Sequence, residues 1–326
     1  MERILRTERW SEKELDVLRL LLVHESVEVV GGAIAAIRSV AKARPDLALE
    51  FTRLAKIGDS KGLASELLTI FTWEQLLGFG GLRIEDVLML FEKIMRIADL
   101  EDHWIETFLA HASQVFPRET AQFLMKRVEA AGMDDWSFRP INHGPYGSVP
   151  LKFKQSEVCG ELLIMLANWM KEGKDKPFSF QYRSRELFEA MFGPYEGETV
   201  DFLENWVKVC DANDIRLIAG ILAEADPEFV FREVGFVGRL LERAKMIGSE
   251  AQKEAISSLY GSAISGLRSG VAGQPMPRDL ETKKKCEEIL PTLPRFSPSF
   301  ELYDALLKDA TRDIERSLKQ AEEWEE

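Results

Sequence analysis

The chain has 326 residues, 45% of them hydrophobic and 30% charged, so it can bury a substantial core and lacks the composition of a disordered or collagen-like protein. Its formal net charge of −13 opposes general binding to nucleic acid. No apolar run reaches the roughly 18–20 residues of a membrane span, and the N-terminus lacks the apolar core of a secretory signal. We therefore expect a cytoplasmic protein with no membrane partner.

The first 131 residues have the pattern of consecutive amphipathic helices. A capping box formed by Ser11 and Glu14 opens the first of them. Apolar residues then recur three or four positions apart in predicted helices at 26–43, from Pro45, and at 64–71, 84–98, 103–115 and 117–131. The connections are short and strand-like alternation is absent, which favours antiparallel helix hairpins.

A proline recurs where helices are predicted to begin. Pro45 and Pro117 are 72 residues apart, and Pro117 and Pro227 are 110 apart, which are close to multiples of about 36 residues. Proline suits a first helical turn because its missing N–H would be unpaired there. The spacing is typical of two-helix repeats, and the N-terminal part resembles a HEAT-like repeat. We predict an all-α, right-handed α-solenoid of stacked helix pairs, interrupted by one long ordered loop.

That loop covers residues 132–155, where three prolines and three glycines exclude a helix. Its aromatic residues indicate order, since disordered segments contain few aromatics. From residue 139 to 185 the chain holds eight basic and four acidic residues, a net charge of +4 within an acidic protein. The loop is either a recognition element for an acidic or phosphorylated protein partner or a staple between two sets of helices. The candidate binding residues are Trp136, Phe138, Arg139, His143, Tyr146, Lys152 and Lys154.

Two other functions compete with protein recognition. One is local binding of phosphate or nucleic acid by the basic segment 139–185, although the overall charge opposes nucleic acid. The other is an enzyme with a site in the loop at 132–153, with His143 as its polar candidate.

The second set of helices follows the loop. The predicted helices lie at 157–171, 184–192, 198–210, 213–225, 227–247 and 250–267. An irregular stretch at 269–277 leads to a short helix at 278–290, and a proline-rich turn precedes the last helix. That helix has one apolar stripe, formed by Leu302, Leu306, Ala310, Ile314 and Leu318. The expected division is 1–131, 132–155, 156–268 and 269–326.

No catalytic, metal or cofactor motif is convincing. Gly58, Ser60 and Gly62 match the spacing of a nucleophile elbow, but a helix precedes them where the elbow needs a strand, so Asp59 or Ser60 is expected to cap a helix. A Walker motif is absent. Acidic residues near His103 are expected at a helix start from the macrodipole alone.

The three cysteines lie far apart, which predicts reduced thiols in or near the core. We therefore expect no enzyme activity, metal or cofactor.

Several segments resemble the C-terminal helical region of bacterial STAND-type nucleotidases. They comprise 138–141 with 151–153, then 162–163, 168–170, 185–188, 265–277 and 293–298. The resemblance implies a sensor that recognises a ligand or protein and relieves the autoinhibition of an attached ATPase, often in antiphage defence. The ATPase itself is not in this chain.

Overall fold

We describe the fold from a computed structural model, which describes residues 10–41, 43–73, 79, 81–131, 137–141, 149–265 and 274–325. Over these residues the protein is all-helical, and the β-type pairing consists of an isolated bridge between Asp99 and Arg139. The chain forms two compact units. Unit 1 comprises 1–162 and 175–191, and unit 2 comprises 163–174 and 192–326. None of the described helices is both long and apolar enough to cross a membrane.

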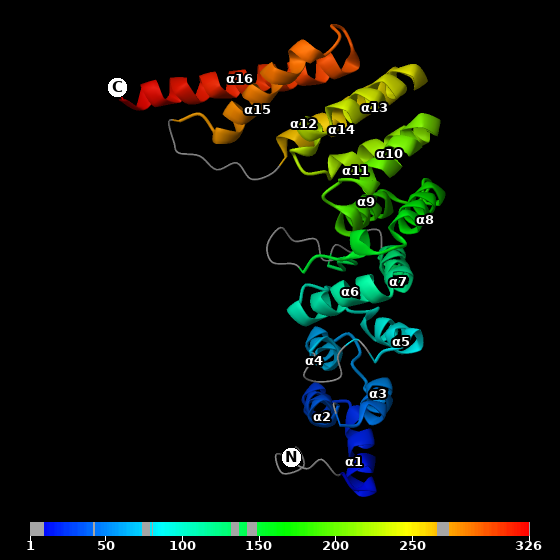
Figure 1. Ribbon diagram of the computed structural model, residues 1–326. Helices are drawn as coiled ribbons and strands as arrows, with labels where there is room; N and C mark the ends of the chain where they lie inside the picture. The colour runs from blue at the N-terminus through cyan, green and yellow to red at the C-terminus, as the bar shows by residue number, and fades with distance from the viewer. Residues whose placement is uncertain are drawn as a thin grey trace. The chain divides into compact units, whose positions relative to one another are not determined.

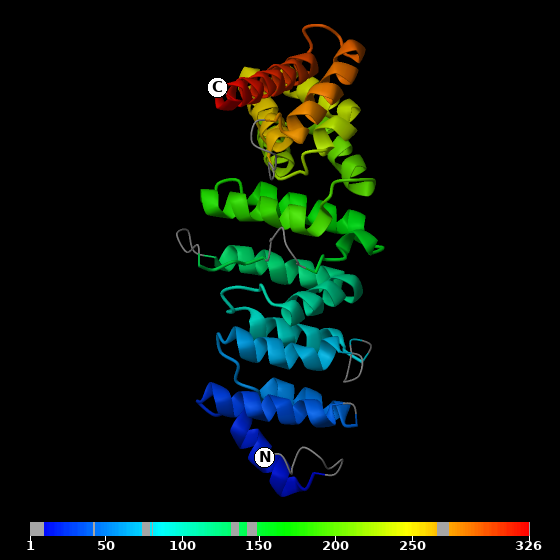
Figure 2. The same cartoon turned by 90° about the vertical axis from the view of Figure 1, so that its left-hand side faces the viewer.

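Unit 1 is built from helices that pack on near neighbours in sequence, which is compatible with a helical repeat (Figures 1 and 2). Helix α2 packs on α4 and α4 on α6, while α7 packs on both α5 and α6. The 3₁₀ turn η2 (Phe153–Gln155) lies against α6. Helix α8 (Cys159–Glu172) is divided between the two units, and α9 (Phe178–Phe192) belongs to unit 1 up to residue 191. The other helices are α1 (Glu12–Leu22), α2 (Val27–Val40), α3 (Pro45–Leu54), α4 (Lys61–Thr72), α5 (Ile84–Ile94), α6 (His103–Val115) and α7 (Pro117–Ala130).

The helix starts in unit 1 confirm several local predictions. Ser11 and Glu14 form the capping box at α1, with the Ser11 N–H donating to Glu14 Oε2 over 2.7 Å. Pro45 and Pro117 occupy the first turns of α3 and α7. Ser60 caps α4 by accepting a hydrogen bond from the Leu63 N–H. The serine of the apparent nucleophile elbow therefore has a structural role.

Unit 2 has a second set of locally paired helices. Helix α11 packs on α14, α13 on α14 and α16, and α15 on α16. Along α16 the predicted stripe is buried from Leu302 to Ile314, whereas Leu318 is 48% exposed. The elements are α10 (Glu198–Val209), α11 (Ala212–Ala223), α12 (Phe229–Arg232), α13 (Val234–Ile247), α14 (Ser249–Ile264), α15 (Pro277–Ile289), η3 (Leu290–Thr292) and α16 (Pro298–Glu325).

The prediction of a single helix at 227–247 is wrong. The structure has the one-turn helix α12 and then α13, separated at Glu233, whose backbone is not helical (φ −103°, ψ 42°). The buried Tyr303 hydroxyl donates to the Val230 carbonyl over 2.7 Å and occupies the acceptor that a continuous helix would use. Pro227 lies in the turn before α12, not in a first helical turn as predicted.

Two further helix boundaries differ from the prediction by four residues or more. Helix α9 begins at Phe178, six residues before the predicted start at Ser184. Helix α5 ends at Ile94, four residues before the predicted end at Ala98, because the carbonyls that follow are used by a side chain from α7.

Candidate functional site

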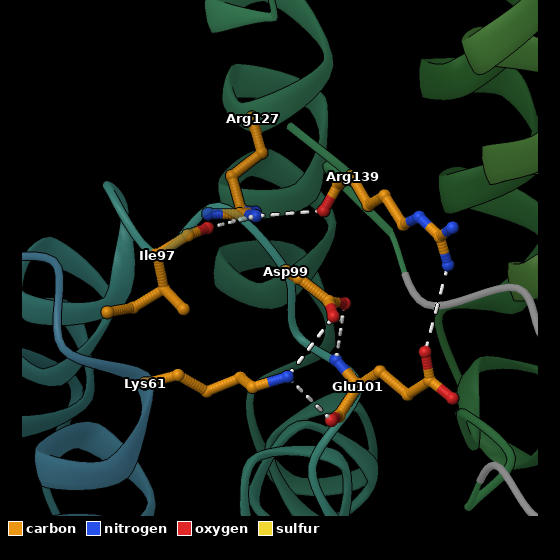
Figure 3. A network of polar contacts seen from close by, with 6 residues as sticks. All are labelled: Lys61, Ile97, Asp99, Glu101, Arg127 and Arg139. Atoms are coloured by element: carbon orange, nitrogen blue, oxygen red, sulfur yellow. Dashed lines mark hydrogen bonds and ion pairs between the residues drawn. The ribbon is translucent and has the colours of Figure 1, made fainter. Parts of the chain in front are cut away.

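A buried arginine organises the part of unit 1 around residues 138–140, the first part of the predicted loop that the structure describes in contact with the helices; we call it the loop entry. Arg127, on α7, is 0% exposed, and all five of its N–H groups are satisfied by backbone carbonyl oxygens at 2.7–3.1 Å. Figure 3 shows the bonds to Ile97 and Arg139. One of these carbonyls belongs to the last residue of α5, two belong to residues just after that helix, and two belong to the loop. The acceptors are Ile94, Met95, Ile97, Arg139 and Pro140.

Further contacts fix the loop entry beside Arg127. The Phe138 ring lies 4.6 Å from the Arg127 guanidinium carbon, in a cation–π arrangement. The Arg139 N–H donates to the Ala98 carbonyl over 2.6 Å, which produces the bridge between Asp99 and Arg139. Residues 138–140 are therefore held by ring, backbone and guanidinium contacts together.

The loop exit is fixed by polar side chains of α6. The Val149 N–H donates to Glu106 Oε2 over 3.0 Å, and the Lys152 N–H donates to Ser113 Oγ over 2.8 Å. Glu106 and Ser113 are themselves buried, and Phe153 fills the core at 0% exposure. Both described ends of the predicted loop are thus attached to the α5–α7 part of unit 1.

Charged side chains surround the entry (Figure 3). Lys61, at the start of α4, pairs with Asp99 over 3.1 Å and donates to the Glu101 carbonyl over 3.2 Å. Burial disfavours the charged form of Asp99, but hydrogen bonds from the Glu101 N–H and Lys61 outweigh it and hold its pKa below the usual range. The Arg139 side chain extends away from Arg127 toward Glu101, at 3.7 Å, and remains 65% exposed.

The structure describes four of the seven predicted binding residues. Phe138 is half-buried, Arg139 is exposed, and Lys152 and Lys154 are half-buried. Lys152 Nζ also donates to Gln114 over 3.2 Å. The other three predicted residues, Trp136, His143 and Tyr146, lie outside the described residues.

The acidic residues near His103 have structural partners. Asp102 caps α6 and accepts a hydrogen bond from Ser65 over 2.6 Å. Glu106 holds the loop exit, and the exposed His103 ring lies 4.9 Å from the Trp104 ring. Within the described ranges, no group of three His, Cys, Asp or Glu side chains is arranged to hold a metal ion.

The basic segment 139–185 is divided between the two units. Lys176 pairs with Glu129 in unit 1 over 3.2 Å, and Lys171 pairs with Asp214 in unit 2 over 3.0 Å. Arg183 is only 3% exposed. Arg127, the main organising residue, carries no sequence signal, because an arginine in an amphipathic helix is normally on the solvent face.

Comparison with known proteins gives no relative: no family model, no curated protein and no solved structure matches the chain.

Proposed function

We propose that the chain is a non-catalytic helical-repeat module that binds a protein partner. The observation that carries the proposal is the attachment of two described stretches of the loop, 138–140 through Arg127 and 149–152 through Glu106 and Ser113. Side chains on stretches that are already held lose less conformational entropy when a partner binds. In this proposal the helices form a right-handed, HEAT-like α-solenoid, an architecture that provides extended binding surfaces.

The proposed partner is an acidic or phosphorylated protein. Arg139 is exposed at the loop entry, and Lys152 and Lys154 are half-buried at its exit. Arginine forms charge-assisted hydrogen bonds with carboxylates and phosphates, and lysines add attraction at longer range. Trp136, His143 and Tyr146 complete the proposed contact surface as residues of the same loop.

A narrower form of the proposal assigns the chain to the sensor part of a STAND-type antiphage signalling ATPase. Its support is the sequence resemblance of segments such as 138–141 and 151–153, which are the two attached ends of the loop. Recognition by the sensor would then control an ATPase outside this chain.

The test begins with affinity purification from the native cell and then uses the purified partner. The variant Arg139→Gln with Lys152→Gln removes two cationic groups, and Lys13→Gln removes one exposed cation on α1 as the control. We expect the double variant to weaken binding about tenfold and to reduce its salt dependence. Equal affinity and equal salt dependence in the double variant and in Lys13→Gln would remove this surface from the proposal.

A further inference from the structure

Three helices of unit 2 line a polar, solvent-open cavity of about 310 Å³ that the proposed function does not use. This volume is near the lower end of the roughly 300–1,000 Å³ typical of small-molecule sites. The charged and hydroxyl groups of its wall come from α14, α15 and α16. They are Tyr260, Arg278, Asp279, Thr282, Asp309, Arg312, Asp313 and Arg316, of which Asp279 is buried.

The arginines of the wall are placed to act together. Arg312 and Arg316 are one turn apart on α16 and therefore share a face of the helix. Their side chains are 64% and 63% exposed. Arg278 belongs to α15 and is oriented by a hydrogen bond of 2.7 Å from its Nη2 to the Ala263 carbonyl. The cavity therefore receives guanidinium groups from two helices.

The cavity wall carries three carboxylates, Asp279, Asp309 and Asp313, beside its three guanidinium groups, and both carboxylates of α16 already have partners. Asp309 already accepts from the Tyr260 hydroxyl and pairs with Arg312 over 2.5 Å. Asp313 pairs with Arg316 over 3.3 Å. A guanidinium has five N–H groups, so one carboxylate pair leaves donors on Arg312 and Arg316 for a ligand. Exposed pairs between residues three apart contribute little energy and are readily exchanged.

We propose that this cavity binds a small molecule through a phosphate monoester group held by Arg278, Arg312 and Arg316. A carboxylate is planar and is satisfied by a single guanidinium in a bidentate pair. A phosphate presents three oxygens in different directions, which suits guanidinium groups that approach from two helices. The apolar side chains of Ile264 and Leu306 also line the cavity and would contact the rest of the molecule.

The first experiment titrates the full chain with inorganic phosphate at constant ionic strength, with acetate and chloride as comparison anions, and follows binding by calorimetry. We expect saturable binding of phosphate alone. Arg312→Gln and Arg316→Gln should each raise Kd at least about tenfold. Arg295→Gln, an exposed arginine in the turn before α16, removes the same charge outside the cavity and should leave Kd unchanged. Equal effects of the three anions, or equal Kd in all three variants, would overturn the proposal.

A second experiment remains informative if an arginine variant fails to fold. Asp313→Asn removes a negative charge from the wall together with the carboxylate that competes for Arg316. We expect it to lower the Kd for phosphate severalfold. Asp304→Asn is the matched control, because Asp304 pairs with Lys308 on the same helix outside the cavity wall. Unchanged or weaker binding by Asp313→Asn, with native helical content by circular dichroism, would contradict the proposal.

Discussion

At the scale of single residues, Arg127 explains how a charge is kept inside unit 1. Burial lowers the pKa of its guanidinium to about 10, and the nearby Asp99 charge offsets part of that effect. The group therefore remains charged at neutral pH. Five carbonyl dipoles replace the water that a charged guanidinium would otherwise bind, so the positive charge is stabilised without a contacting carboxylate.

Replacing Arg127 should be costly because its five acceptors are fixed in the core. In Arg127→Met the side-chain volume is largely retained, but the carbonyls lose their donors, at about 1–3 kcal/mol for each one left unsatisfied. Relaxation and water entry recover part of this, and we expect a loss of about 3 kcal/mol or more in the free energy of unfolding. Urea denaturation measures this change.

The control for this prediction is Arg118→Met on the same helix. Arg118 is 55% exposed and pairs with Glu161, so its replacement should change the free energy of unfolding by less than about 1 kcal/mol. Similar destabilisation by the two substitutions would mean that the Arg127 hydrogen bonds do not stabilise unit 1.

At the scale of helices, the capping box makes the stability of α1 depend on pH. The Ser11 backbone N–H donates to Glu14 and, together with the Ser11 hydroxyl, lowers the pKa of Glu14. A carboxylate whose pKa is lower in the folded state stabilises above its unfolded pKa, and this stabilisation is lost as the pH falls through the folded value. We expect the protection of the α1 amides, which is the intrinsic exchange rate at each pH divided by the observed rate, to fall from about pH 4.3 downward. Glu14→Gln should abolish that fall; its persistence in the variant would point to other carboxylates.

The helix register can be tested with two proline substitutions. Pro117→Ala changes a first-turn position and should cost about 1 kcal/mol or less, because proline there mainly restricts the unfolded chain. Leu222→Pro lies near the end of α11 at a buried position and should cost roughly 3 kcal/mol or more. Thermal unfolding compares them, and equal melting temperatures would be incompatible with the α11 register.

These helices also show which features the sequence can predict. Helix α6 has the predicted bounds, because Asp102 caps it and Pro117 begins the next helix, and both signals lie within a few residues of the boundary. The break between α12 and α13 depends on Tyr303, which is 73 residues from Val230. The burial of Arg127 likewise depends on distant residues, because its carbonyl partners lie up to 33 residues away. Periodicity and capping identify local determinants and carry no information on such distant partners.

For the candidate site, the clustering of proline and glycine predicted an irregular segment at 132–155. Its described parts 137–141 and 149–152 are not helical, whereas 153–155 forms the 3₁₀ turn η2, and Arg139 is exposed as a binding residue requires. The local sequence did not show what holds these parts. Phe138 is half-buried against Arg127, so it supports the loop as well as the proposed surface. Glu106 and Ser113 lie in a regular helix and have no pattern that predicts a contact with Val149 or Lys152.

At the scale of the whole molecule, the cysteines provide a probe in each unit. Cys159 belongs to unit 1, and Cys210 and Cys286 belong to unit 2. All three are free and at most 2% exposed, which confirms the prediction of reduced, buried thiols. Burial raises the pKa of the Cys286 thiol to about 12, so only about one molecule in 10⁴ carries the reactive thiolate at pH 8.

We therefore predict that thiol reagents modify the native chain at least about a hundredfold more slowly than the denatured chain, because reaction requires opening of the helices. Since each unit has its own core, Leu222→Pro should accelerate the labelling of Cys210 and Cys286 more than that of Cys159. Arg127→Met, in unit 1, should accelerate the labelling of Cys159 more than that of Cys210 and Cys286. Mass spectrometry of the labelled peptides separates the three rates. Equal acceleration of all three thiols by either substitution would show that the chain opens as one cooperative unit.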